Sequence, residues 1–144
     1  MEPLDLTKRP PRSPREKVNG LFMMARTIDK MRAMSPGGSL GEYKLAGFSQ
    51  QLLEALGISE QAFQDVVARA KSDDDVAHWL AQHTDQTRYE AINREFSEES
   101  TADASERFHE RYPVARKYNL LTLFDVLEYD DREAFGIAHP KTPA

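Results

Sequence analysis

The residues best suited to chemistry lie in the stretch 26–32, Arg-Thr-Ile-Asp-Lys-Met-Arg, which places three cations, a carboxylate and a hydroxyl within about two helical turns. A glycine-rich turn and the tripeptide Gly-Glu-Tyr at 41–43 follow directly. Guanidinium groups bind carboxylates and phosphates through paired hydrogen bonds. The spacing therefore predicts a candidate ligand site made of Arg26, Asp29, Lys30, Arg32, Glu42 and Tyr43.

Several interpretations of this set stay open. In the first, a binding or accessory domain holds a small anionic molecule or an acidic segment of a partner, with Tyr43 closing over it. In the second, the protein is a small enzyme acting on an organic acid or phosphoester, with Asp29 or Glu42 as general base and Tyr43 as acid. In the third, the charges form only a structural network, in which an Asp29–Arg32 ion pair stabilises the core.

Other kinds of site lack their sequence patterns. The chain has no cysteine, no His-Glu-x-x-His and no Gly-x-Ser-x-Gly. The glycine-rich segment 35–41 follows an expected helix, whereas a nucleotide-binding loop follows a strand. We therefore expect no metal and no cofactor, and we interpret four nearby carboxylates as solvated: Glu128, Asp130, Asp131 and Glu133.

Charge is distributed unevenly along the chain. Residues 1–32 carry eight Lys or Arg against four Asp or Glu, a balance of +4, and the remainder carries eleven against twenty, a balance of −9. An acidic body argues against nucleic-acid binding, and we expect the basic segment to dock on it. With no apolar leader or membrane-spanning run, we expect a cytoplasmic monomer or homodimer.

The elements that position the candidate site are expected to be helical. A proline-rich arm over residues 1–13 precedes Ser-Pro-Arg-Glu at 13–16, a typical helix start. The first helix is predicted to run to about Met34, with Arg32 in the middle of its apolar face and Asp29 at the edge of that face.

The rest of the chain reads as short helices separated by capping residues, starting near Ser49, Ser59, Ser72, Thr84, Ala104 and Thr122. Gly57 and Ile58 have the pattern of a helix end. The prediction is an all-α fold: an irregular bundle of about six helices around a long first helix. The arm (1–13) packs on a single domain (14–136), followed by a flexible tail (137–144).

Several stretches together resemble an uncharacterised bacterial family, the domain of unknown function 5069. They are residues 5–15 (Asp-Leu-Thr-Lys-Arg-Pro-Pro-Arg-Ser-Pro-Arg), 25–33 (Ala-Arg-Thr-Ile-Asp-Lys-Met-Arg-Ala), 41–43, 56–58 (Leu-Gly-Ile) and Trp79. The resemblance covers most of the chain, is most specific in the first sixty residues, and implies a small helical bacterial protein without implying an activity. After the tyrosine the family has a second aromatic and a Cys-Pro-Leu-Asp-like step, where this chain reads Lys-Leu-Ala-Gly-Phe-Ser at 44–49. A ligand site that used that aromatic would be altered here.

Overall fold

A computed structural model describes residues 1–139, and the secondary structure of this part is helical. It contains α1 (Met24–Met34), α2 (Phe48–Leu56), α3 (Glu60–Arg69), α4 (Asp73–His83), the 3-10 turn η1 (Gln86–Arg88), α5 (Tyr89–Ser97), α6 (Glu106–Arg111), α7 (Val114–Lys117) and α8 (Leu123–Phe135). Only isolated β-bridges occur between these described residues. The predicted all-α class is confirmed, with more and shorter helices than expected.

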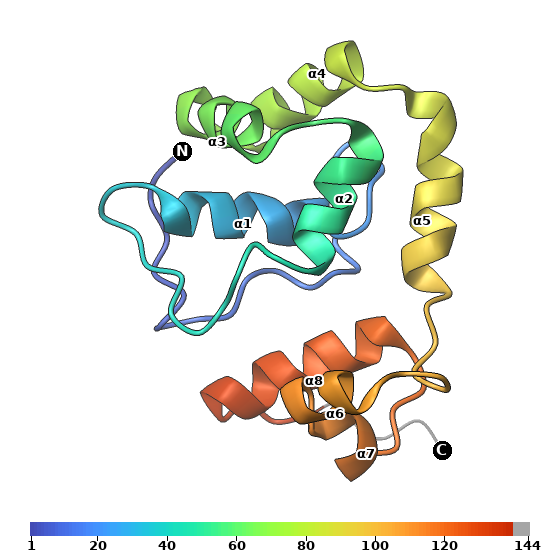
Figure 1. Ribbon diagram of the computed structural model, residues 1–144. Helices are drawn as coiled ribbons and strands as arrows, with labels where there is room; N and C mark the ends of the chain where they lie inside the picture. The colour runs from blue at the N-terminus through green and yellow to red at the C-terminus, as the bar shows by residue number, and fades with distance from the viewer. Residues whose placement is uncertain (140–144) are drawn as a thin grey trace.

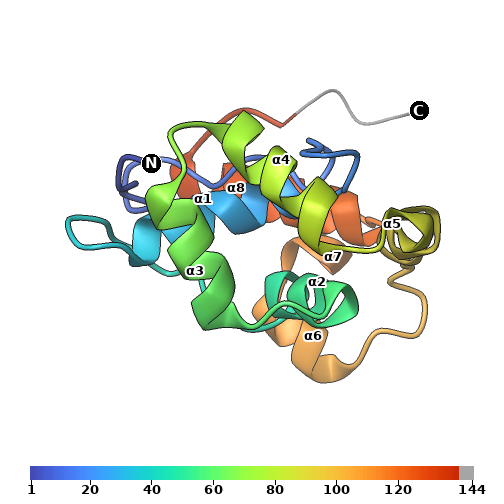
Figure 2. The same ribbon diagram turned by 90° about the horizontal axis from the view of Figure 1, so that it is seen from above.

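The helices form two groups around α1 (Figure 1). Helices α3 and α4 lie over α1, and α8 lies beneath it, as the views from the side and from above agree (Figures 1 and 2). Helix α1 packs against α2 and α3, while α5 links the upper group to α8. In residues 1–139 no helix is long and apolar enough to cross a membrane.

The first helix is shorter than predicted, because the segment before it turns instead of continuing a helix. Asn19 and Gly20 both have positive φ, 51° and 75°, and Val18 and Leu21 exchange backbone hydrogen bonds across this turn. Asn-Gly is a strong signal for a tight turn. The predicted helix start at Ser13 forms a single turn, in which Ser13 accepts a hydrogen bond from the Arg15 N–H, and α1 begins at Met24.

The N-terminal arm contacts the helices through both apolar side chains and backbone hydrogen bonds. Leu4 and Leu6 are buried in a cluster with Tyr43, and the Leu4 N–H donates to the Arg32 carbonyl at 3.3 Å. Further along, the Met23 N–H donates to the Pro14 carbonyl at 2.9 Å. The arm and the residue that directly follows it are therefore hydrogen-bonded near both ends of α1.

Nearly the whole circumference of α1 is buried. Its apolar residues belong to the main core, with Leu52 of α2, Phe63 of α3 and Leu80 of α4. Its polar residues Arg26, Thr27, Asp29 and Lys30 are also buried. Each of these polar groups requires a partner or a change of protonation state, since an unpaired buried charge is costly.

Local signals explain most of the other boundaries. Ser59, Ser105 and Thr122 cap α3, α6 and α8 with their side chains, and Gly57 ends α2 in the left-handed region while the Ile58 N–H bonds to Leu53. Helices α2 and α4 begin where expected, near Ser49 and Ser72, although neither serine side chain caps its helix. Ser49 lies inside α2, and Ser72 is the N-cap residue of α4 but its side chain makes no cap bond.

The predicted tail is described in part. The Ile137 N–H donates to the Arg132 carbonyl at 2.9 Å, and His139 stacks on Tyr129 with ring centroids 4.5 Å apart. Residues 137–139 therefore lie against α8. The remainder of the predicted flexible tail, 140–144, lies outside the described residues.

Candidate functional site

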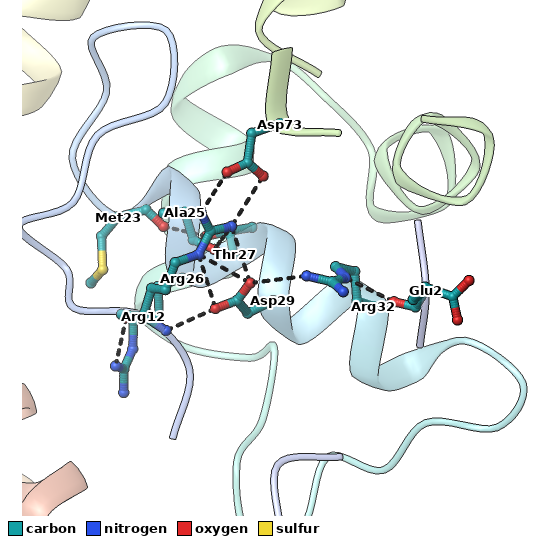
Figure 3. A network of polar contacts seen from close by, with 9 residues as sticks. All are labelled: Glu2, Arg12, Met23, Ala25, Arg26, Thr27, Asp29, Arg32 and Asp73. Carbon is teal, nitrogen blue, oxygen red and sulfur yellow. Dashed lines mark hydrogen bonds and ion pairs between the residues drawn. The ribbon is translucent and has the colours of Figure 1, made fainter. Parts of the chain in front are cut away.

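The charged residues of α1 divide between two sides of the helix. On one side, Asp29 is bound by Arg12 of the arm (Figure 3). The Arg12 backbone N–H donates to Asp29 Oδ2 at 2.8 Å, and Arg12 Nη2 donates to Asp29 Oδ1 at 3.1 Å. Arg12 Nη2 also reaches Asp73 Oδ1 at 3.1 Å. Because Arg12 donates to Asp73, the pKa of the Asp73 carboxyl is lowered.

Arg32 belongs to the same side. Its Nη1 lies 3.9 Å from Asp29 Oδ1, and its Nε donates to the Glu2 carbonyl at 2.8 Å. The predicted Asp29–Arg32 pair is therefore present but loose, and Arg12 is the main partner of Asp29. These contacts fasten the arm to α1 and to the start of α4.

Arg26 also reaches the arm, since its Nη1 donates to the Arg12 carbonyl at 3.3 Å, but its main partner is Asp131 of α8, with which it forms a buried ion pair. The two Nη atoms donate to the two carboxylate oxygens at 2.7 and 3.0 Å. The Tyr43 hydroxyl donates to Asp131 Oδ1 at 2.9 Å. Burial lowers the pKa of Arg26, but the hydrogen bonds and charge of Asp131 outweigh it and raise that pKa overall. Burial, together with Asp131, raises the pKa of Tyr43.

Lys30 lies one turn after Arg26, exposes 8% of its surface and has no hydrogen bond or ion pair to any residue from 1 to 139. Burial, followed by the charge of Arg26, lowers the pKa of Lys30 to about 7. Lysine normally keeps its proton until about pH 10.4. Near neutral pH, Lys30 therefore exchanges between an ammonium ion and a free amine.

Lys30 faces a cavity of about 430 Å³ between α1, the loop that precedes α2, α6 and α8. Its polar lining includes Arg26, Lys30, Tyr43, Lys44, Arg107, Arg111, Tyr112 and Asp130. Lys44, Arg107 and Arg111 are exposed and surround the opening, whereas Arg26, Lys30 and Tyr43 are buried. Since Asp131 neutralises Arg26, the lining formed by residues 1–139 has four other cations and one carboxylate, Asp130.

The structure brings together half of the predicted site residues. Arg26, Lys30 and Tyr43 line the cavity. Asp29 and Arg32 are not part of the lining and instead contact the arm, at Arg12 and Glu2. Glu42 is exposed and is not part of the lining.

Five of the polar lining residues were not anticipated as site residues: Lys44, Arg107, Arg111, Tyr112 and Asp130. Arg107 and Arg111 are four residues apart on one helix, a spacing visible in the sequence, and Lys44 directly follows Tyr43. No sequence signal links α6 or Asp130 to α1, since that depends on tertiary packing.

The interpretation of the acidic cluster near residue 130 as solvated is wrong for Asp131. Asp131 is buried in the Arg26 pair, and Asp130 is half-buried with its Oδ2 4.0 Å from Arg111 Nη1. Burial raises the pKa of Asp130. Among residues 1–139, no three His, Asp or Glu side chains are grouped in a way that could hold a metal ion.

Fold and site together define a small all-α protein whose polar cavity carries more cations than carboxylates. The chain belongs to the family described as Domain of unknown function (DUF5069), which it matches over residues 8–133. The matched span includes the Arg12 contacts, all of α1 and the lining of the cavity. A comparison with curated proteins gives no match.

Proposed function

We propose that this protein is a binding or accessory domain that holds a small organic or inorganic anion in the cavity between α1, α6 and α8. The observation that carries the proposal is Lys30, a buried lysine on the cavity wall with no counter-ion among residues 1–139. A buried ammonium ion is costly unless it is paired. A bound carboxylate or phosphate would supply the missing partner.

The other charges of the lining support an anion as the ligand. Lys44, Arg107 and Arg111 surround the opening and would attract an anion to it, although the whole chain has a net charge of −5. Asp130 is the single lining carboxylate within the described part of the chain, and Arg111 lies beside it. A cationic recess on an acidic protein is a local arrangement that the net charge does not predict.

Arg26 and Tyr43 have a different role in this proposal. Both Nη groups of Arg26 already donate to Asp131, and the Tyr43 hydroxyl donates to the same carboxylate. The Nη groups of Arg26 and the hydroxyl of Tyr43 are thus bonded to protein. They would form a fixed wall that holds Lys30 in place, while the ligand binds Lys30 and the exposed cations.

The size of the cavity favours a small molecule over an acidic segment of a partner protein. A volume of about 430 Å³ is within the range of small-ligand sites. An acidic peptide would contact Lys44, Arg107 and Arg111 but would leave the buried Lys30 unpaired.

The enzymatic alternative with Glu42 or Asp29 as base and Tyr43 as acid has little support. Glu42 is exposed and away from the lining, and Asp29 is bound by Arg12 on the arm side. The Tyr43 proton is already donated to Asp131.

Calorimetric titration tests the proposal, using sulfate, phosphate, and mono- and dicarboxylates at pH 6.5 and low salt. We expect at least one anion to bind wild type, and Lys30→Met and Arg111→Gln each to weaken its binding. Lys71→Met is the matched control, since Lys71 is exposed and lies outside the cavity lining. The proposal fails if no anion binds folded wild type, or if Lys30→Met and Lys71→Met bind it equally well.

A further inference from the structure

We propose that Lys30 is a nucleophilic amine that forms a Schiff base with a ligand carrying a carbonyl group beside its anionic group, the class of 2-oxo acids. This inference rests on the proposed anion site. It assigns Lys30 a covalent role that simple ion pairing does not require.

The first support is the placement of Lys30. Structural lysines in a protein interior are paired with carboxylates, but both carboxylates near Lys30 have other partners. Asp131 receives hydrogen bonds from Arg26 and Tyr43, and Asp130 lies beside Arg111. Lys30 therefore lines the cavity without being required by the ion pairs that hold α1 to α8.

The second support is the protonation state that this environment gives Lys30. Only the unprotonated amine attacks a carbonyl carbon, and nucleophilic lysines are activated by burial or by a neighbouring cation. Lys30 has both, since burial and the charge of Arg26 lower its pKa to about 7. Arg111 acts in the same direction, while the charge of Asp131 opposes it.

The third support is a group of cations that could bind the anionic group of such a ligand. Lys44, Arg107 and Arg111 are exposed at the opening, and Lys30 is buried. A carboxylate bound by the outer cations would direct an adjacent carbonyl inward, toward the amine. In a 2-oxo acid these two groups are directly bonded.

The proposed step balances without an oxidant or reductant. The Lys30 nitrogen forms a bond to the carbonyl carbon and gives a carbinolamine. The carbon–oxygen bond then breaks, and oxygen leaves as water with the two hydrogens of the amine. Asp130, a lining carboxyl whose pKa burial raises, is suited to carry a proton to the departing hydroxyl.

Reductive trapping tests this inference on the full chain. The protein is incubated at pH 7 with glyoxylate, pyruvate or 2-oxoglutarate and sodium cyanoborohydride, and adducts are measured by intact mass and peptide mapping. We expect Lys30 to be labelled about tenfold faster or more than the exposed Lys44 and Lys71, because at pH 7 it holds a much larger fraction of free amine than an ordinary lysine. Lys30→Met should lose the fast adduct while circular dichroism shows an unchanged fold.

Matched ligands separate this inference from the anion site itself. Lactate and 2-hydroxyglutarate replace the carbonyl by an alcohol, so they should compete for the cavity without forming an adduct. If they bind but Lys30 is labelled no faster than Lys71 by any 2-oxo acid, the Schiff base is overturned and the anion site stands. If no anion binds and Lys30 is not labelled faster, both proposals fall.

Discussion

Arg26 and Asp131 are separated by 105 residues and form a buried ion pair in which two parallel hydrogen bonds, of 2.7 and 3.0 Å, join α1 to α8. The pair joins α1 to α8, the helix that lies beneath α1 in Figure 1. It also leaves Arg26 electrically matched, so that Lys30 is the buried lining cation without a counter-ion among residues 1–139.

Breaking this pair from one side should strongly destabilise the fold. Arg26→Met leaves Asp131 buried with only the Tyr43 hydroxyl as a side-chain partner. We expect a loss of about 3–5 kcal/mol in the free energy of unfolding, measured by urea denaturation, because the remaining charge is orphaned. Asp131→Leu should cost a similar amount.

The double variant Arg26→Met/Asp131→Leu is the informative control, since it removes both charges. Its cost should be well below the sum of the two single costs. Arg94→Gln breaks an exposed pair with Glu90 and should change stability by less than about 0.5 kcal/mol. Additive single costs would contradict a direct Arg26–Asp131 coupling.

The Asp29–Arg12 contact predicts a second, smaller effect. Asp29→Asn keeps the shape of the side chain but weakens its bonds to the Arg12 backbone and guanidinium. We expect a loss of about 1–3 kcal/mol, less than for Arg26, because Arg12 is partly exposed and keeps Asp73 as a partner. Urea denaturation measures this loss.

Glu42→Gln is the matched control for Asp29→Asn, since Glu42 is exposed. It should leave the free energy of unfolding within about 0.5 kcal/mol of wild type. Equal effects of the two substitutions would show that Asp29 does not fasten the arm.

Helix class and many boundaries followed from local signals, as at Ser59, Gly57 and Thr122, because capping depends on residues close in sequence. The predicted start of the first helix at Ser13 is wrong, because the Asn19-Gly20 turn interrupts the segment that the Ser13 cap begins. Both signals, the Ser13 cap and the Asn-Gly turn, were present in the sequence. In the structure with the turn, Leu21 and Met23 are buried in the main core.

The candidate site was predictable only on the α1 side. Arg26, Lys30 and Tyr43 are close in the chain, and their types and spacing indicated an anion site. Asp131 and Arg111 reach the same region through the packing of α8 and α6. No periodicity records that packing, so the sequence could not separate the paired Arg26 from the unpaired Lys30.

The pKa of Lys30 predicts how stability varies with pH. Because its folded pKa, about 7, lies below the unfolded value near 10.4, the unfolded chain holds more protons between these values. The contribution of Lys30 should therefore raise the free energy of unfolding by about 2–4 kcal/mol as pH rises from about 7 toward 9.5. Below pH 7 this gain is absent.

Chemical denaturation of wild type and Lys30→Met across this range measures the Lys30 contribution. The charged or titratable groups that share its surroundings are Arg26, Tyr43, Lys44, Arg107, Arg111, Tyr112, Asp130 and Asp131. The pKa values of Tyr43 and Tyr112 are raised, so both tyrosines titrate above the window. Lys30→Met should flatten the slope, while Lys71→Met retains it. Parallel slopes in all three proteins would contradict a lowered pKa for Lys30.

Anion binding should take up a proton at pH 7.5. Free Lys30 is then mostly unprotonated, and an anion beside it favours the ammonium form and raises its pKa. Sulfate or a dicarboxylate stays ionised at this pH, so the ligand itself contributes no proton change. Calorimetric titration in two buffers of different ionisation enthalpy should give an uptake of about 0.5–0.8 proton per anion bound.

Two variants locate the group that receives this proton. In Lys30→Met any residual anion binding should proceed with no uptake, because the titrating amine is gone. In Asp130→Asn the uptake should persist, although burial raises the pKa of Asp130 as well, because this variant keeps the Lys30 amine that receives the proton. Uptake that disappears in Asp130→Asn and survives in Lys30→Met would assign the proton to the carboxyl. The anion would then bind at the outer cations without reaching Lys30.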